Sequence, residues 1–198
     1  MPSISGGGKF ASGDQMGGTE GTTGIMLPAW VDGTLQPVEK LEAHERGLRH
    51  KAVSVFVMDG ERLLLQRRAL GKYHTPGLWA NTCCTHPGWD EPADLCAARR
   101  LREELGITGL DLQHRGQVEY RAEGGGGLIE HEGVEVLLAQ AGEALQIDPN
   151  PAEVMETRWQ DLGDLRAELL RDPQAFPPWL RIDMDRHAGL IFGAEGAK

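Results

Sequence analysis

The segment PADLCAARRLREELG, residues 92–106, is the clearest helix in the sequence. Pro92 suits the first turn, because the N–H that proline lacks would have no partner there, and Gly106 suits the C-terminal stop. The buried stripe of this helix is expected from four apolar residues at helical spacing: Ala97, Ala98, Leu101 and Leu105.

The same helix carries a charged face. Arg100, Glu103 and Glu104 share one side through spacings of three and four residues, away from Leu101 and Leu105. Such a face has two interpretations, a solvated surface with helical salt bridges or a site for metal and anion. The helix alone favours the solvated surface.

Strands are expected both before and after this helix in the sequence. Apolar runs predict strands at residues 25–31, 52–58, 62–66, 110–120, 128–140 and 156–160. Asp59 and Gly60 predict a hairpin between the second and third of these runs. Residues 70–80 are expected to form a loop, while 161–171 and the stretch after Pro178 are expected to be helical. This order favours an α+β fold.

Composition limits the possible partners and the number of domains. We expect one domain over residues 25–198 and a disordered glycine-rich N-terminal tail over 1–24. The net charge of −10 argues against non-specific binding to nucleic acid or anionic lipid, so an anionic ligand needs a local basic cluster. The sequence shows no apolar run long enough for a membrane span and no secretory signal. Three cysteines make a poor disulfide framework, so a cytoplasmic location is expected.

Three short segments gather residues that can bind metal or transfer protons. They are His44 with His50, Cys84-Thr85-His86, and Glu130-His131-Glu132. In an extended chain, alternate side chains point to the same side, so Cys84 would accompany His86 and Glu130 would accompany Glu132. Taken singly, each segment more often has an ordinary structural role, as a surface histidine, a core cysteine or a solvated strand face.

The charged helix resembles a degenerate Nudix box, a loop–helix motif in which glutamates bind divalent metal beside a diphosphate. Six positions match: Glu91, Arg99, Glu103, Glu104, Gly106 and Ile107. Thr85 departs from the first glycine of the box, and Arg100 stands where the box has a metal-binding glutamate. A guanidinium in place of a carboxylate suits a phosphate oxygen better than a metal, which weakens the case for hydrolysis.

From about Lys40 to Trp179 the chain resembles the type I isopentenyl diphosphate isomerase family. Beside the charged helix, the matching segments are 39–40, 48–50, 67–70 with Lys72, 76–79, Asn81, 84–87, 120–122, 130–132 and 178–179. The resemblance implies a Nudix-like mixed β-sheet sandwich flanked by helices. It also implies an enzyme of isoprenoid biosynthesis that interconverts isopentenyl and dimethylallyl diphosphate by protonation and deprotonation.

This resemblance implies two metal sites. The first would be a divalent site for manganese, zinc or magnesium with five ligands: His44, His50, His86, Glu130 and Glu132. Ligand type alone does not choose among these metals. Glu104 would share a magnesium ion with the substrate diphosphate.

The resemblance also assigns roles to the remaining candidates. Cys84 and Glu132 would transfer protons, Tyr120 would hydrogen-bond near Glu132, and Trp179 would close over the hydrocarbon. The diphosphate would be bound by five cationic residues: Lys40, Arg67, Arg68, Lys72 and Arg100. Because Arg67 and Arg68 are adjacent on an expected strand, they should face opposite ways, and we prefer Arg68 with Lys72 for this role.

The expected partner is therefore a small isoprenoid diphosphate, with no nucleic acid or membrane, and the chain is expected to be a monomer or weak dimer. Two alternatives stay open at this point. One is a Nudix-type diphosphohydrolase, and the other is a binding or scaffold protein that has kept the fold without activity.

Overall fold

The computed structural model describes residues 24–193, so the tail expected at 1–24 lies outside this range except for Gly24. The strands are β1 (Met26–Val31), β2 (Thr34–Glu39), β3 (His50–Asp59), β4 (Arg62–Arg68), β5 (Trp79–Ala80), β6 (Cys83–Thr85), β7 (Gln113–Gly125), β8 (Leu128–Gln140) and β9 (Val154–Asp161). The helices are α1 (Lys40–Arg46), α2 (Ala93–Leu105), α3 (Leu162–Arg171), α4 (Pro178–Ile182) and α5 (Ala188–Phe192). A short 3₁₀ helix (Pro173–Ala175) and a π-helical turn (Asp183–His187) complete the described chain.

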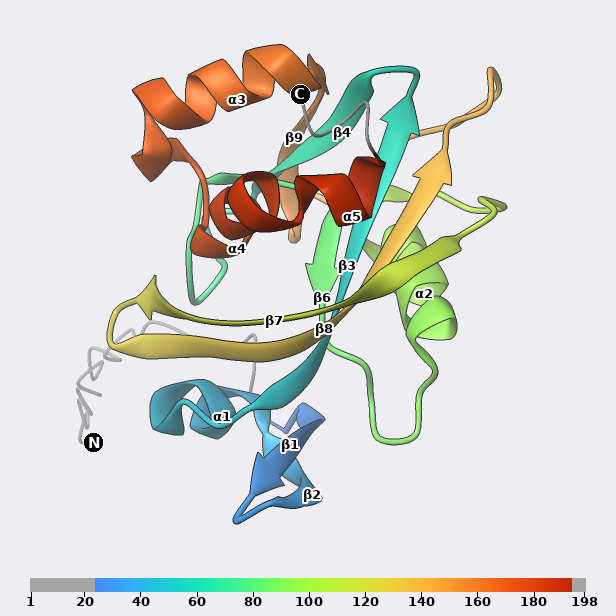
Figure 1. Ribbon diagram of the computed structural model, residues 1–198. Coiled ribbons are helices and arrows are strands. Elements are labelled where there is room, and N and C mark those ends of the chain that lie inside the picture. Colours follow the sequence, from blue (N-terminus) through green and yellow to red (C-terminus); the bar gives the residue numbers. More distant parts are fainter. Residues whose placement is uncertain (1–23, 194–198) are drawn as a thin grey trace, which may run out of the picture.

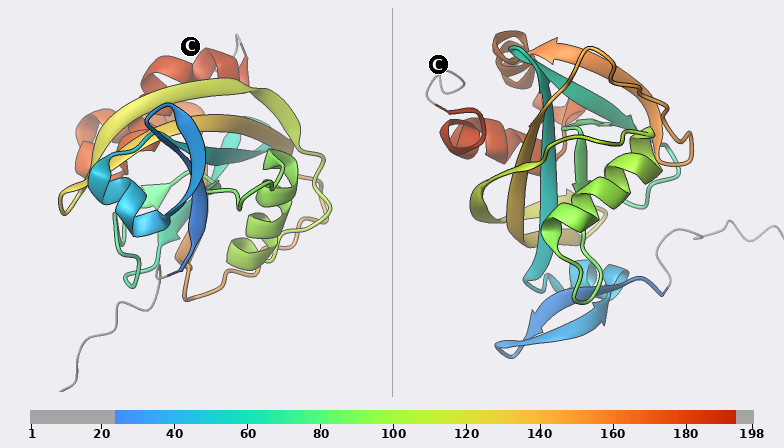
Figure 2. Two further views of the ribbon diagram at one scale, coloured as in Figure 1. Left: turned by 90° about the horizontal axis from the view of Figure 1, so that it is seen from below. Right: turned by 90° about the vertical axis from the view of Figure 1, so that its right-hand side faces the viewer.

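Within residues 24–193 the strands form a single mixed sheet of nine strands. Its centre is the parallel pair β3 and β8, which stay in register from His50 opposite Glu132 to Met58 opposite Gln140. The other pairings are antiparallel: β7 adds to β8, while β1, β4 and β6 add to β3. Helices cover both faces, with α2 on one side and the C-terminal helices on the other (Figures 1 and 2).

The central strand β3 is buried on both faces, as parallel strands covered by helices usually are. Ala52, Phe56 and Met58 face the core beneath α3, α4 and α5. Val53, Val55 and Val57 alternate with them and face the core beneath α2. Because successive side chains of β3 point to opposite faces, this strand packs against the helices on both sides of the sheet.

Helix α2 confirms the expected boundaries to within one residue. Pro92 occupies the N-cap, and Gly106 closes the helix in the left-handed region at φ 68°, with its N–H directed back to the carbonyls of Leu101 and Arg102. A Cβ on Gly106 would lie 2.8 Å from Cβ of Asp148, so the position also lacks room for a side chain. Ala97, Leu101 and Leu105 are buried, as expected, but the prediction was wrong for Ala98, which is exposed, and Cys96 is buried instead.

Most of the expected elements are confirmed, including the hairpin through Asp59 and the strands β7, β8 and β9. Strand β2 and helix α1 were not predicted. Together with β1 they form an N-terminal hairpin and helix with their own small core of Leu27, Ala29, Val38 and Ala43, below the main sheet in Figure 1. In residues 24–193, the helices are too short or too polar to cross a membrane.

Candidate functional site

Five side chains from three elements and one loop meet at one end of the central strands. They are His44 from α1, His50 at the start of β3, His86 just after β6, and Glu130 and Glu132 from β8. One potential ligand atom from each lies within 4.8 Å of all the others. Because β3 and β8 are parallel, His50 and Glu132 are direct cross-strand neighbours. The group could therefore hold a metal ion.

Two of the three imidazoles of this group, His44 and His50, are oriented as metal ligands usually are. Nδ1 of His44 lies 2.6 Å from the carbonyl oxygen of Lys40, and Nδ1 of His50 lies 2.8 Å from that of Leu48. A carbonyl can only accept, so each Nδ1 carries the proton and each Nε2 presents a lone pair. Both Nε2 atoms are buried without a hydrogen-bond partner, and they face carboxylate oxygens at 3.3 and 3.5 Å. These two unpartnered nitrogen lone pairs, which face carboxylate oxygens, fit a divalent cation.

Glu132 is the most heavily contacted carboxylate of the group. Its Oε1 lies 2.8 Å from Nε2 of His86, and its Oε2 accepts a hydrogen bond from the hydroxyl of Tyr120 on the neighbouring strand β7. Burial and the charge of Glu132 raise the pKa of Tyr120, so its hydroxyl keeps its proton. His131 points the other way, towards the carbonyl of Gly47, as the period of two predicts.

A cluster of basic residues lies beside this His/Glu group, in a pocket that His86, Glu130 and Glu132 also line. Lys40, Arg68, Lys72 and Arg100 line this pocket together with Glu104, Cys84 and Trp179. Burial and the charges of Arg68 and Arg100 lower the pKa of Lys40. Burial likewise lowers the pKa of Lys72 to about 8. Partly buried cations that repel one another form a natural binding site for a polyanion.

Carboxylates pair with these cations. Glu153 pairs with Lys72 and also approaches Arg100 at 3.5 Å, while Glu104 binds Arg100 at 2.6 Å. The cavity between the side chains is only about 40 Å³, against roughly 300–1,000 Å³ for typical ligand pockets. A diphosphate would therefore need some of these side chains to move, and Lys72 and Glu153 are both partly exposed.

Arg67 is the candidate that the structure separates from the others. Its Nε donates to the carbonyl of Gly77 at 3.0 Å, and its guanidinium lies over Trp79 and near Glu156, outside the residues that line the pocket. Arg68 points to the opposite side of β4, into the pocket, as adjacent strand residues must.

Cys84 and Trp179 form the apolar side of the pocket. Trp179 is 2% exposed, its Nε1 donates to Oδ1 of Asn81 at 3.2 Å, and the guanidinium of Arg68 lies 5.3 Å from its ring. Burial and the nearby Glu132 raise the pKa of the Cys84 thiol, so Sγ carries its proton. Cys83 packs in the other core, beneath α2.

Two side chains that line the pocket, Tyr73 and His74, were not predicted from the sequence. Nε2 of His74 lies 3.0 Å from Oε1 of Glu130, and burial lowers the pKa of His74 to about 4. Both residues follow Lys72 in a segment that the sequence marks only as a loop. A histidine beside a candidate phosphate ligand was the available signal.

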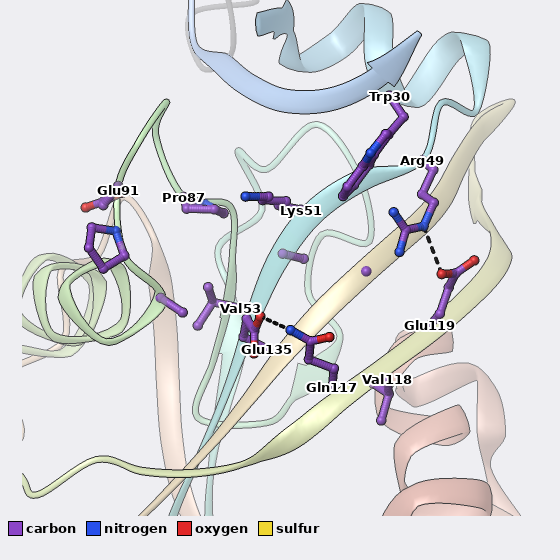
Figure 3. Close-up of a pocket in the computed structure, with 14 residues that line it drawn as sticks. Trp30, Arg49, Lys51, Val53, Pro87, Glu91, Gln117, Val118, Glu119 and Glu135 are labelled. Carbon is purple, nitrogen blue, oxygen red and sulfur yellow. Dashed lines mark hydrogen bonds and ion pairs between the residues drawn. The ribbon is translucent and has the colours of Figure 1, made fainter. Parts of the chain in front are cut away.

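A larger pocket of about 470 Å³ lies elsewhere, between β1, the start of α2 and the strands β3, β7 and β8 (Figure 3). Its polar side chains pair with one another, since Arg49 binds Glu119 at 2.8 Å and Gln117 binds Glu135. Three members of the His/Glu group, His86, Glu130 and Glu132, line the smaller pocket together with the basic cluster, so we place the candidate active site there despite its size.

Known proteins match both the fold and the sequence. The NUDIX domain family matches residues 48–180. The crystal structure of DR0079 from Deinococcus radiodurans superposes with a TM-score of 0.59 at 14% identity, covering 74% of this chain and 89% of that one, which supports the fold alone.

Relatives named isopentenyl-diphosphate Delta-isomerase match most of the sequence. One from Cereibacter sphaeroides is 66% identical and covers 85% of this chain and 95% of its own length. One from Ruegeria pomeroyi is 61% identical and covers 87% of this chain and 96% of its own length. The chain therefore belongs to the isopentenyl-diphosphate Delta-isomerase family, within the proteins that share the NUDIX domain.

Proposed function

We propose that this protein interconverts isopentenyl diphosphate and dimethylallyl diphosphate. The observation that carries the proposal is one pocket lined by a protonated thiol, a carboxylate, an indole and four cations: Cys84, Glu132, Trp179, Lys40, Arg68, Lys72 and Arg100. The relatives' shared name supports the same substrate class.

Moving the double bond requires one proton to be added and another to be removed from the five-carbon skeleton. Cys84 holds a proton at Sγ, and the carboxylate of Glu132 is ionised, because the imidazoles of His50 and His86 outweigh the effect of burial and lower its pKa. One group can therefore give a proton while the other takes one. Since the reaction is reversible, the two exchange these roles between directions.

Tyr120 and Trp179 would assist this pair. The hydroxyl of Tyr120 donates to Glu132, which positions the carboxylate and offers a path for its proton. The buried indole of Trp179 would face the tertiary centre that becomes positively charged, an interaction worth about 2 kcal/mol when desolvated. Burial of Trp179 would also keep water from quenching that centre.

The diphosphate would be bound by the basic cluster. Arg68 and Arg100 offer guanidinium groups that match phosphate oxygens, and Lys40 and Lys72 add two ammonium groups. Binding would release Lys72 from Glu153. Glu104 would hold a magnesium ion shared with the diphosphate, a use of one carboxylate plus phosphate oxygens that suits this metal.

The five His/Glu residues would hold a second divalent ion, manganese, zinc or magnesium. This ion would supply positive charge that fixes Glu132 in its ionised form and tunes its basicity. His44 and His50 fit this role through their orphaned Nε2 atoms.

The test is turnover of isopentenyl diphosphate in deuterated water with added divalent metal. Deuterium in the dimethylallyl diphosphate formed would support the proposal, and stripping metal with a chelator should stop turnover until metal is restored. Release of phosphate without an allylic product would instead identify a diphosphohydrolase and refute it.

A further inference from the structure

His74 lies beside the His/Glu group, and the proposed function gives it no role. It lies in the loop between β4 and β5, is 8% exposed, and places Nε2 3.0 Å from Oε1 of Glu130. Nε2 of His44 lies 3.3 Å from the other oxygen, Oε2. The carboxylate of Glu130 is therefore held between two imidazoles, with one oxygen facing each.

The ring of His74 approaches this group from outside. His74 does not belong to the five residues whose ligand atoms come within 4.8 Å of one another, and its ring centroid lies 5.7 Å from that of His44. On its other side it lies 5.8 Å from the ring of Trp179. His74 thus contacts both the proposed metal ligand Glu130 and the indole of Trp179.

The backbone around His74 is strongly constrained. Thr75, the next residue, has φ 45°, a left-handed conformation that is costly for a β-branched side chain. The carbonyl oxygen of His74 accepts a hydrogen bond from Nη2 of Arg68 at 3.2 Å. A strained turn fixed to a buried guanidinium persists only where the surroundings require it, and strain of this kind concentrates at functional sites.

We propose that His74 is a positioning residue that donates from Nε2 to Oε1 of Glu130 and fixes this carboxylate in the geometry for metal binding. The inference rests on the proposed metal site. It adds to the five ligands one histidine that orients a ligand without binding the metal. Partners of this type orient metal ligands, and losing one typically weakens metal binding by roughly 10- to 100-fold.

Two substitutions separate hydrogen bonding from packing. His74→Phe keeps a ring against Trp179 but removes the donor, whereas His74→Gln keeps an N–H donor near the place of Nε2 but removes the ring. The affinity for Mn²⁺ is measured by electron paramagnetic resonance of the free ion in competition with a chelator. Wild type, His50→Ala and His114→Phe serve as references, because His114 is exposed and pairs with Glu135 far from this group in the sheet.

We expect His74→Phe to bind Mn²⁺ roughly 10- to 100-fold more weakly than wild type, His74→Gln to bind nearly as well, and His114→Phe to be unchanged. If His74→Phe does not fold, His74→Leu removes the same donor. The reverse order, with His74→Phe normal and His74→Gln weak, would show a packing role and overturn the inference.

Two further outcomes would also overturn it. Loss of binding in both variants as complete as in His50→Ala would make His74 a direct ligand instead. Failure of the wild type to bind Mn²⁺ would remove the metal site itself. Isomerase turnover is not needed for this test, so its absence bears on the proposed function alone.

Discussion

Replacing Tyr120 with phenylalanine removes one hydroxyl from the centre of the proposed chemistry and little else. Tyr120 is 6% exposed and Glu132 is 2% exposed, and the hydroxyl donates to Oε2 of this carboxylate. Tyr120 itself does not line the pocket. Tyr120→Phe should therefore change the environment of Glu132 without changing contacts to the diphosphate.

The size of the effect follows from the hydrogen bond that is lost. A hydrogen bond to a charged group contributes about 1.5–3 kcal/mol. Since about 1.36 kcal/mol corresponds to tenfold in rate, kcat should fall roughly 10- to 150-fold. KM should change little, because the four cations that would bind the diphosphate are untouched.

The assay is steady-state conversion of isopentenyl to dimethylallyl diphosphate, followed together with deuterium uptake from solvent. Mn²⁺ affinity is measured in parallel, since a change there would mean that Glu132 had moved as a metal ligand. An unchanged kcat in a folded Tyr120→Phe protein would refute the reasoning. So would a rise in KM without a fall in kcat.

Other changes test separate parts of the site and fold. Cys84→Ala should lower kcat by at least about 100-fold, while Cys83→Ala, on the other side of β6 beneath α2, should retain turnover in the same assay. Because burial lowers the pKa of Lys72 to about 8, its positive charge is present below pH 8 and lost above it. A profile of kcat/KM against pH should therefore fall through that range, and Lys72→Arg should remove the fall. Gly106→Ala forces a left-handed alanine against Asp148, and chemical denaturation should show a loss of about 1–2 kcal/mol or more.

The local structure of helix α2 is determined by its own sequence. Pro92, Gly106 and the apolar spacing of Leu101 and Leu105 act over a few residues, so they predict the helix and its buried face directly. The alternation along residues 130–132 likewise predicts that both glutamates point away from His131, which the structure confirms. These signals are local, and local geometry is enough to interpret them.

The surroundings of the charged face of α2 could not be predicted from the helix sequence alone. From the helix alone, Arg100 and Glu104 read as a solvated salt bridge, yet Glu104 is 3% exposed and bonded to Gln66 from β4. Whether a charged face meets solvent or a pocket depends on what packs across from it. That partner lies far away in the sequence, so the spacing within the helix carries no information about it.

The sequence by itself determined the helix, the strand alternation and, through its motifs, the chemistry of the candidate residues. Only the tertiary structure decided that Glu132 lies between His50 and Tyr120 and that His74 reaches Glu130. The physical reason is the parallel pairing of β3 with β8. A parallel pair needs a long crossover, so its register is set by the packing of both sheet faces rather than by any turn between the two strands.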